Sequence, residues 1–434
     1  MRRRIFVNFI LIIVLTLGFS CTYAQIPAQA PTEDNYFINF EELVRVVKEV
    51  KDKYVDDVTL KDLLHNAFRG ILEGLDPYSQ YISPEELEEL RIETEGEFGG
   101  LGIEVIVKDG ILTVITPIVG SPAFDAGVLV GDKILRIEGE STENISIRNA
   151  IKKLRGKPGS KVTITVLHEG DNTPVDVTIE RAVIHVKSVR GARIVDENSK
   201  IGYFAITTFQ ENTLQEMDAA VKELLDKGMS ALIIDLRFNP GGLLNAAVDV
   251  ADRFIKEGVI VSTKGRDEAQ NVIYTAKEKD TYPDFPLIVL VNNGSASASE
   301  IVAGAIKDHK RGLLLGLKTF GKGSVQSLIP IEEGKSALKL TTAKYYTPSG
   351  VSIHELGIEP DIKVELTLAE VKALHEQLSR VNVGDIRNNG GNKQPQKEGE
   401  DTEKAKTKFV DAQLERAVNV MKGIQIYSKQ FKSD

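Results

Sequence analysis

Cysteine is almost missing from this sequence, since Cys21 is the only one among 434 residues. One thiol excludes an intramolecular disulfide as a stabilising element. Histidine is also scarce, and none of the six histidines forms a pair at the spacing of metal ligands. We therefore expect neither a metal site nor a cofactor.

Basic side chains are in the minority, with 54 Lys and Arg against 63 Asp and Glu, which gives a net charge of −9. No basic stripe stands out, so a nucleic-acid partner is not expected. A hydrophobic fraction of 42% and a charged fraction of 27% are typical of a globular protein. The length of 434 residues exceeds that of one ordinary core and predicts two to four domains.

Residues 1–24 are predicted to be an export signal. A basic start at Arg2–Arg4 precedes the mostly apolar run Phe6–Phe19, and Thr22–Ala24 ends in the small residue that a cleavage site needs. The apolar run is short for a membrane span, which takes about 20 residues. The pattern therefore predicts a periplasmic or cell-envelope protein.

Two forms of membrane association stay open at this stage. The chain could be retained through residues 5–19, or Cys21 could be lipidated, because it directly follows the apolar run. The segment Gly18–Ser20 lacks the aliphatic residue that usually stands three positions before a lipidated cysteine. The alternative is that Cys21 is removed with the signal, which the mass of the mature N-terminus would decide.

Residues 25–97 are predicted to be an N-terminal helical region behind a tether at 25–35. Apolar residues recur at helical spacing in 39–54 and 59–75, with Asn39 as a candidate N-cap. The run Ser83–Glu86 supplies an N-cap, a proline at the first helical position and two acids, and so predicts a third helix.

Residues 98–182 change to short alternating strands with glycine-containing turns. The loop Gly99–Gly102 enters a strand, and the segments Ser121–Gly127 and Gly131–Gly139 read as a short helix and a strand between turns. This stretch resembles a PDZ domain, with a compact β-barrel-like fold. The resemblance implies that a peptide carboxylate binds Gly99, Gly100, Leu101 and Gly102, and that its chain adds to the strand starting at Ile103. The alternative is an ordinary glycine turn.

Residues 183–383 follow an α/β pattern. The apolar strands 201–206, 231–236 and 287–291 alternate with amphipathic helices, which predicts a largely parallel sheet with its site at the carboxyl ends of the strands. Residues 384–408 are polar and are predicted to be a flexible linker. Residues 409–434 are predicted to form a final helix, whose apolar stripe has to pack on its own core or on a neighbouring subunit.

The stretch from Pro286 to Gln326 contains the strongest candidate chemistry. Three alternating serines, Ser295–Ser299, precede a helix, where free N–H groups and the positive end of the helix dipole favour an oxyanion. A lysine bracketed by glycines follows at Gly321–Gly323. The plainer interpretation is that the serines cap the helix and the glycines form turns.

Three other site types fit this region less well. Gly316–Lys322 matches a P-loop, but Gly323 stands where Ser or Thr should bind Mg²⁺, and a strand is expected to follow. Ser336–Lys339 fits S-x-x-K without the companion motifs of penicillin-binding enzymes. In a Ser-His-Asp triad, His309 would lie about 18 Å from Ser297 along one helix, and nothing marks His354 as the base.

Five segments together resemble the carboxyl-terminal processing (tail-specific) protease family, a group of serine peptidases with a PDZ domain. These are Gly202–Gln210, Asp235–Gly242, Ser295–Glu300, Thr319–Gln326 and Gly357–Asp361. The resemblance runs from about Phe40 to Asp361. It implies an α+β multidomain chain, in which a ClpP/crotonase-like α/β protease core carries an inserted PDZ domain and N- and C-terminal helices.

The resemblance also implies roles for individual residues. The nucleophile maps to Ser297, the general base to Lys322, and the residue that assists the lysine to Gln326. Burial would lower the pKa of a lysine, so that more of its amine is neutral and able to accept a proton near neutral pH. Ala298 and Gly242 are the expected oxyanion donors, with Gly241 as the alternative to Gly242, while Glu300 is expected to brace the helix. Arg155 is the candidate for coupling the PDZ domain to the protease, the alternative being a plain surface arginine.

These expectations define an exported serine endopeptidase that recognises polypeptide C-termini through its PDZ domain and hydrolyses peptide bonds with a Ser-Lys dyad. Its partners would be unfolded or tailed polypeptides, a second copy of the chain bound through the terminal helices 39–54 and 409–427, and a regulatory adaptor. The competing hypotheses are a non-catalytic PDZ scaffold and a protease that stays silent until a partner assembles it.

Overall fold

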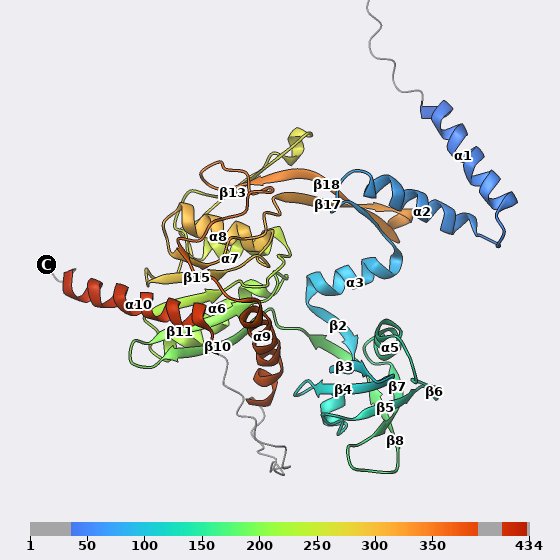
Figure 1. Cartoon of the computed structure of the whole chain (residues 1–434), viewed down its shortest axis with the longest axis horizontal. Helices are drawn as coiled ribbons and strands as arrows, with labels where there is room; N and C mark the ends of the chain where they lie inside the picture. The colour runs from blue at the N-terminus through green and yellow to red at the C-terminus, as the bar shows by residue number, and fades with distance from the viewer. Residues whose placement is uncertain (1–35, 389–409, 432–434) are drawn as a thin grey trace, which may run out of the picture. The chain divides into compact units, whose positions relative to one another are not determined.

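The computed structural model describes residues 36–388 and 410–431 (Figure 1). These residues divide into two compact units, with the boundary between Gly70 and Ile71. The predicted signal 1–24, with Cys21, and the tether 25–35 lie outside the described residues. Among the helices that are described, none is long and apolar enough to cross a membrane.

The first unit contains α1 (Tyr36–Lys53) and most of α2 (Leu60–Glu73). Both helices were predicted, although α1 begins three residues before the predicted cap at Asn39. Their apolar side chains are largely exposed in this unit, among them Phe40, Leu43, Val44, Val50, Leu60 and Leu64.

The second unit starts with the short strand β1 (Gln80–Ile82) and helix α3 (Pro84–Glu95). The predicted start of α3 is confirmed by a capping box. The Ser83 hydroxyl accepts from the Glu86 N–H at 3.3 Å, and the Glu86 carboxylate accepts from the Ser83 N–H at 2.9 Å. Each residue thus satisfies a donor of the other, which stabilises the first turn.

The PDZ region is built on one antiparallel sheet in the order β3-β4-β5-β7-β8, with β3 at an edge. Its strands are β3 (Ile103–Lys108), β4 (Ile111–Pro117), β5 (Lys133–Ile137), β7 (Lys161–Leu167) and β8 (Val175–Glu180), with helices α4 (Pro122–Asp125) and α5 (Ile147–Leu154). Two short strands, β2 (Glu97–Gly100) and β9 (Ala182–His185), pair where the chain enters and leaves this region. A separate apolar core includes Leu112, Ile134, Ile164 and Val166.

The protease core contains a six-stranded sheet in the order β10-β11-β12-β15-β16-β19 (Figure 1). Its strands are β10 (Val189–Asp196), β11 (Ile201–Ile206), β12 (Ala231–Asp235), β15 (Leu287–Val291), β16 (Leu313–Gly316) and β19 (Ile362–Lys363). All neighbours are parallel except β10 and β11, which confirms the predicted parallel sheet.

Helices cover both faces of this sheet. Side chains of α6 (Thr213–Asp226), α7 (Leu244–Asp252) and α8 (Ala298–Asp308) form one large core with the sheet. On the opposite face, Ala417 and Met421 of α10 (Ala412–Phe431) pack on strand residues that include Tyr203, Ile233 and Ile288. The apolar stripe of the final helix is therefore buried against its own sheet.

A second sheet joins distant parts of the chain. Its long strand β18 (Ser336–Tyr346) pairs with β17 (Ser324–Ile331), β1 and β13 (Val259–Gly265), and β13 pairs with β14 (Ile273–Thr275). The sequence predicted two strands, 335–340 and 344–346, where the structure has the single strand β18. The intervening residues 341–343 pair with β17 and so keep the strand continuous.

The predicted linker 384–408 is wrong at its start, because helix α9 (Leu368–Asn388) includes its first five residues. The polar composition of 384–388 is typical of a linker, although these residues end a helix that begins earlier. At the start of the helix, the Thr367 hydroxyl accepts from the Glu370 N–H at 3.3 Å, and the Glu370 carboxylate accepts from the Thr367 N–H at 2.7 Å. The remainder of the predicted linker lies outside the described residues.

Candidate active site

Ser297 stands at the sharp turn between β15 and α8, as the residue before the first residue of the helix. Its backbone is in the left-handed region at φ 54° and ψ −113°, and only 8% of the residue is exposed. A non-glycine residue is held in such a conformation only by strong surrounding contacts, and active sites are a common place for it.

The neighbouring serines have structural partners. The fully buried hydroxyl of Ser295 donates to the Leu236 carbonyl at 2.7 Å, and that of Ser299 donates to the Asn239 carbonyl at 2.9 Å. Both hydroxyl groups therefore fix the turn to the loop that follows β12. Within residues 36–388 and 410–431, the Ser297 hydroxyl differs from the other two in having no such bond to a main-chain carbonyl.

Tyr345 on β18 is the phenol that interacts with the Ser297 hydroxyl. Burial of the Tyr345 phenol raises its pKa to about 12, while the Ser297 hydroxyl acts in the opposite direction. Tyr345 was not expected at this site. It lies 48 residues beyond Ser297, and its sequence showed only an apolar strand residue.

Glu300 holds two parts of the site together. Its Oε2 accepts from the backbone N–H groups of Ser297 at 2.9 Å and Lys322 at 2.8 Å, so these two nitrogens lie less than about 6 Å apart. Its Oε1 accepts from the Thr319 hydroxyl at 2.6 Å and the Gly321 N–H at 2.7 Å. The carboxylate is fully buried, and burial raises its pKa against the effect of these four donors. The predicted helix brace is thus also the link between the serine turn and the lysine loop.

Lys322 is half-buried on the loop between β16 and β17. Burial lowers the pKa of its amine, the charge of Lys339 lowers it further, and Glu300 opposes both. The Nζ atom lies 5.1 Å from the centre of the Tyr78 ring, a cation–π distance. Burial and the charge of Lys339 thus favour the neutral amine, but the side chain lies against Tyr78.

Gln326 extends from β17, and its side-chain amide donates to the hydroxyl groups of Ser324 at 2.9 Å and Thr341 at 3.4 Å. Within residues 36–388 and 410–431, no hydrogen bond connects the side chain of Lys322 to Ser297 or Gln326. The three predicted residues come from adjoining segments but do not form a continuous relay in this structure.

The loop after β12 lies against the serine turn. A Cβ atom at Gly241 would lie 2.9 Å from the Ser297 Cβ atom, so only glycine fits there without a shift. The Gly241 N–H is already used, because it donates to Asn239 Oδ1 at 2.9 Å. The N–H groups of Gly242 and Ala298 have no acceptor within the described part of the chain. This difference favours Gly242 over Gly241 as a free donor.

A cavity of about 330 Å³ lies beside the edge strand β3 of the PDZ region. It is lined by four of the predicted peptide-binding residues, Gly100, Leu101, Gly102 and Ile103, and by Ile151, Leu154 and Arg155. The fifth predicted residue, Gly99, is not part of the lining, and its carbonyl accepts from the Gly156 N–H at 3.0 Å.

Arg155 lies at one end of this cavity, directly after α5. Its guanidinium stacks over the Phe98 ring at 4.3 Å, and burial lowers its pKa. The carboxylates that oppose this shift are Glu89 and Glu93 on α3. Arg155 therefore faces the PDZ cavity and α3, and no contact with the Ser297 turn is found among the described residues.

The alternative sites find no support. A strand follows Gly323 where a P-loop needs a helix, and Ser336 is buried with its hydroxyl bonded to Glu332 at 2.6 Å. His309 ends α8, and its Nε2 atom bonds to the Val259 carbonyl at 2.7 Å. His354 lies beside Gly323, but its Nδ1 atom has no partner in the described part of the chain.

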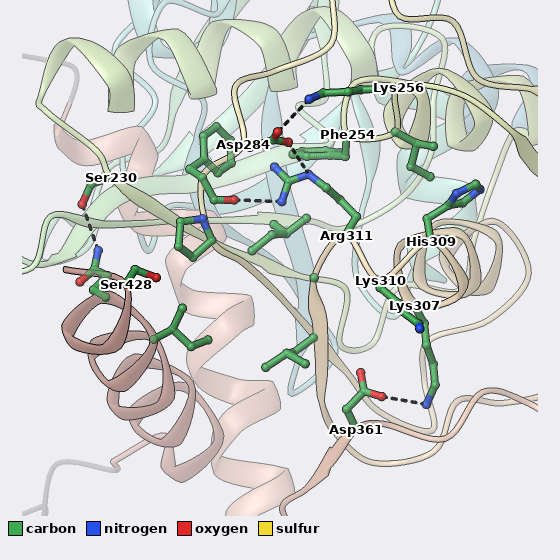
Figure 2. Close-up of a pocket in the computed structure, with 18 of the residues that line it drawn as sticks. Ser230, Phe254, Lys256, Asp284, Lys307, His309, Lys310, Arg311, Asp361 and Ser428 are labelled. Atoms are coloured by element: carbon green, nitrogen blue, oxygen red, sulfur yellow. Dashed lines mark hydrogen bonds and ion pairs between the residues drawn. The ribbon is translucent and has the colours of Figure 1, made fainter. Parts of the chain in front are cut away.

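A second cavity, of about 990 Å³, lies at the other end of α8 (Figure 2). Its charged side chains form local pairs, Lys256 with Asp284 at 2.8 Å and Lys307 with Asp361 at 3.1 Å. None of the predicted site residues lines this cavity. It is therefore separate from the Ser297 site.

Comparison with known proteins identifies the family of this chain and its PDZ domain. A family model described as peptidase family S41 matches residues 200–364, and a PDZ domain model matches residues 99–179. A carboxy-terminal-processing protease of Bartonella bacilliformis is 43% identical over 350 residues, covering 79% of this chain and 80% of the relative. A carboxyl-terminal-processing protease of Synechocystis is 37% identical over 325 residues, covering 74% and 75%. A solved photosystem II D1 C-terminal processing protease is 30% identical with a TM-score of 0.43, covering 74% of this chain and 92% of that one.

Proposed function

This chain belongs to peptidase family S41, as a PDZ-containing carboxy-terminal processing serine protease, and from that premise we propose that it is an exported Ser-Lys endopeptidase selecting polypeptides by their free C-termini. The observation that carries the proposal is the Glu300 carboxylate, which holds the main chain of Ser297 and that of Lys322 on one oxygen atom. This contact supports the proposal because it keeps Ser297 and Lys322, which are 25 residues apart in sequence, on adjoining loops.

The proposed reaction proceeds through an acyl-enzyme. The Ser297 Oγ atom attacks the carbonyl carbon of the substrate, and the neutral Lys322 amine takes the hydroxyl proton. The N–H groups of Gly242 and Ala298 donate to the oxyanion that forms. The C–N bond then breaks, and the Lys322 ammonium returns its proton to the leaving amine. Water repeats the sequence on the ester, which releases the second product and restores Ser297.

Catalysis requires a rearrangement of the lysine from the position it occupies here. The Lys322 ammonium has to leave the Tyr78 ring, and the Ser297 hydroxyl, which faces the Tyr345 phenol here, has to form a hydrogen bond to the amine. The side chain of Gln326 then orients the amine without favouring its charge, since an amide is neutral. We regard the present arrangement as a resting state, as in the hypothesis of a protease that is silent until a partner or substrate assembles it.

In this proposal, the PDZ domain selects substrates by their C-termini. The edge strand β3 and the loop at Gly100–Gly102 offer main-chain donors to an added peptide strand and its carboxylate, as in peptide recognition by strand addition. The side chains behind them are apolar, namely Leu101, Ile103, Ile115, Ile151 and Leu154. Arg155 lies at the end of the same cavity. Through Arg155, binding of a peptide in the cavity would affect the position of α3 and the protease core.

Export and association belong to the same proposal. The predicted signal 1–24 directs the chain to the periplasm or cell envelope, and the mass of the mature N-terminus distinguishes cleavage from lipidation at Cys21. Helix α1 exposes apolar side chains and is the proposed contact with a second copy or an adaptor. The stripe of α10 packs on its own sheet and is not available for that purpose.

The deciding experiment measures hydrolysis of an unfolded protein and of a peptide with a free apolar C-terminus. Ser297→Ala and Lys322→Ala should each abolish cleavage, while Ser295→Ala should retain it at a temperature below its melting point. The Ser295 variant controls for disturbance of the turn. Residual cleavage by Ser297→Ala would refute the assignment of the nucleophile. A wild-type chain that binds the peptide and never cleaves it would support the PDZ scaffold.

A further inference from the structure

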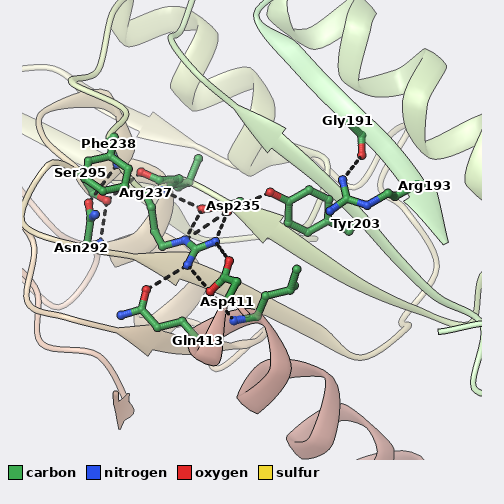
Figure 3. A network of polar contacts seen from close by, with 12 residues as sticks. Gly191, Arg193, Tyr203, Asp235, Arg237, Phe238, Asn292, Ser295, Asp411 and Gln413 are labelled. Atoms are coloured by element: carbon green, nitrogen blue, oxygen red, sulfur yellow. Dashed lines mark hydrogen bonds and ion pairs between the residues drawn. The ribbon is translucent and has the colours of Figure 1, made fainter. Parts of the chain in front are cut away.

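Arg237 connects the C-terminal helix to the loop that carries the proposed oxyanion donor (Figure 3). It lies two residues beyond the end of β12 and precedes the loop Phe238–Gly242, and its side chain is 0% exposed. No role in the proposed reaction has been given to it or to its partners.

Two carboxylates hold its guanidinium, one from the end of β12 and one from the residue before α10 (Figure 3). Asp235 accepts from Nε at 2.9 Å and from Nη2 at 2.7 Å, and Asp411 accepts from Nη1 at 2.9 Å and from Nη2 at 2.6 Å. Gln413 adds a bond from Nη1 at 3.0 Å. The guanidinium therefore has a partner for every nitrogen, and the buried carboxylates raise its pKa well above the ordinary value.

The partner residues are themselves anchored. Asp411 precedes α10 and accepts from the Leu414 N–H at 3.1 Å, so it caps the helix while it binds Arg237. The side chain of Gln413 donates to the Val364 carbonyl at 2.8 Å. The start of α10 thus reaches Arg237 from a segment 174 residues away in sequence.

The loop next to Arg237 is strained and depends on neighbouring contacts. Phe238 has a φ of 61°, and its N–H donates to the Asn292 side chain at 2.9 Å. The next residue, Asn239, accepts from the Ala296 N–H at 3.0 Å and from the Ser299 hydroxyl at 2.9 Å, on either side of Ser297. A shift at Arg237 would therefore be passed along the loop to Gly242 and the serine turn.

We propose that Asp411 is a positioning residue, which fixes the oxyanion loop through Arg237 and makes the start of α10 a required part of the active site. The inference rests on the proposed function, because it takes Gly242 as an oxyanion donor. Removing Asp411 leaves a buried guanidinium short of one charged partner. The loop then relaxes, and its N–H group no longer points at the oxyanion.

The test compares full-length variants on one short peptide substrate. Asp411→Ala should lower kcat about 10- to 100-fold, the range expected when an oxyanion donor is misplaced, with KM changed less than about twofold. Its affinity for a peptide aldehyde, which forms a tetrahedral adduct with serine, should fall in parallel. The aldehyde measurement reports the oxyanion contact and not simply the amount of folded protein.

The matched control is Gln425→Ala. This residue also fastens α10 to the core, since its amide donates to the Ser199 carbonyl and the Ser230 hydroxyl, both at 3.0 Å, far along the helix from Arg237. It should keep kcat and aldehyde affinity within about twofold of wild type. If Asp411→Ala does not fold, Gln413→Met removes a single bond to Arg237 and should lower kcat about threefold.

Unchanged kcat in Asp411→Ala, or equal losses in Gln425→Ala, would overturn the inference. The first result would show that the loop keeps its shape without the contact between Asp411 and Arg237. The second would show that any loosening of α10 lowers kcat equally. The proposed function fails in a different way, through cleavage that persists in Ser297→Ala. If wild-type cleavage depends on Ser297 and the Asp411→Ala variant keeps the wild-type kcat, only the role of Asp411 is refuted.

Discussion

The sharpest consequence of the site geometry concerns the carboxylate of Glu300, which accepts four hydrogen bonds inside the core. Replacing it by the amide in Glu300→Gln keeps the shape of the side chain and leaves one acceptor atom in place of two. Whichever way the amide lies, its NH₂ group faces a backbone N–H that can only donate.

The two orientations differ in cost. With its oxygen toward Ser297 and Lys322, the amide can donate to the Thr319 hydroxyl, and only the Gly321 N–H loses its acceptor. With the oxygen reversed, two backbone donors lose theirs. A hydrogen bond to a charged group contributes about 1.5–3 kcal/mol. We therefore expect the first orientation, and a loss of about 2 kcal/mol in the free energy of unfolding of the protease core.

The effect on catalysis should be larger than stability alone suggests. Gly321 precedes Lys322, so a shift of its main chain moves the base relative to Ser297. We expect kcat to fall about tenfold in Glu300→Gln and at least about 100-fold in Glu300→Ala, which leaves all four donors without an acceptor. Urea unfolding followed by circular dichroism gives the stability, because the chain has no tryptophan, and cleavage of a short peptide gives kcat.

The control is Glu359→Gln, which removes an exposed carboxylate paired with Lys318 at 3.0 Å. An exposed pair of this kind contributes less than about 1 kcal/mol, so both measurements should stay near wild type. Wild-type stability and kcat in Glu300→Gln would show that the carboxylate does not hold the two loops together. Equal losses in the glutamine and alanine variants would contradict the orientation argument.

Three further outcomes follow from the same structure. Lys339→Gln removes a charge that lowers the pKa of Lys322, so that pKa should rise, the acidic limb of the kcat/KM–pH profile, where the base loses its proton, should move to higher pH, and activity at pH 7 should fall. Tyr345→Phe removes the phenol hydroxyl that interacts with the Ser297 hydroxyl in the resting state and should raise kcat about twofold to fivefold, at a loss of at most about 1 kcal/mol in unfolding free energy; a lower kcat would contradict the resting-state argument. Gly102→Ala places a Cβ atom 2.3 Å from that of Ser121 at a φ of +72°, so KM for a substrate with a free C-terminus should rise about tenfold, whereas cleavage of a short blocked peptide, measured in parallel, should be unchanged.

The sequence predicted the elements of this fold where one local signal determined them. Strand 287–291 appears in the structure with the predicted bounds, because a continuous apolar run between polar turns has few other interpretations. Helix α3 is another case, since serine, proline and two acids specify its start. Helix α9 was missed because its later residues are as polar as a linker.

The contacts that assemble the site could not be predicted in this way. Glu300 meets the Lys322 N–H across 22 residues, and Arg237 meets Asp411 across 174. Such pairs depend on which strands become neighbours, and the local pattern around each residue carries no information on that. The family resemblance supplied the candidate residues Ser297, Lys322 and Gln326, and the structure supplied the hydrogen bonds around them.

The position of Lys322 and its protonation are linked. Burial and the charge of Lys339 disfavour the ammonium, whereas the Tyr78 ring attracts it. The charged side chain is therefore best placed over the ring, away from the nucleophile, and the neutral amine loses that attraction. A substrate bound beside Ser297 would exclude water from Lys322 and so favour its neutral amine. The neutral side chain would then leave the Tyr78 ring and move toward Ser297. In this scheme the base becomes competent when a peptide is bound, which limits hydrolysis by an unoccupied enzyme.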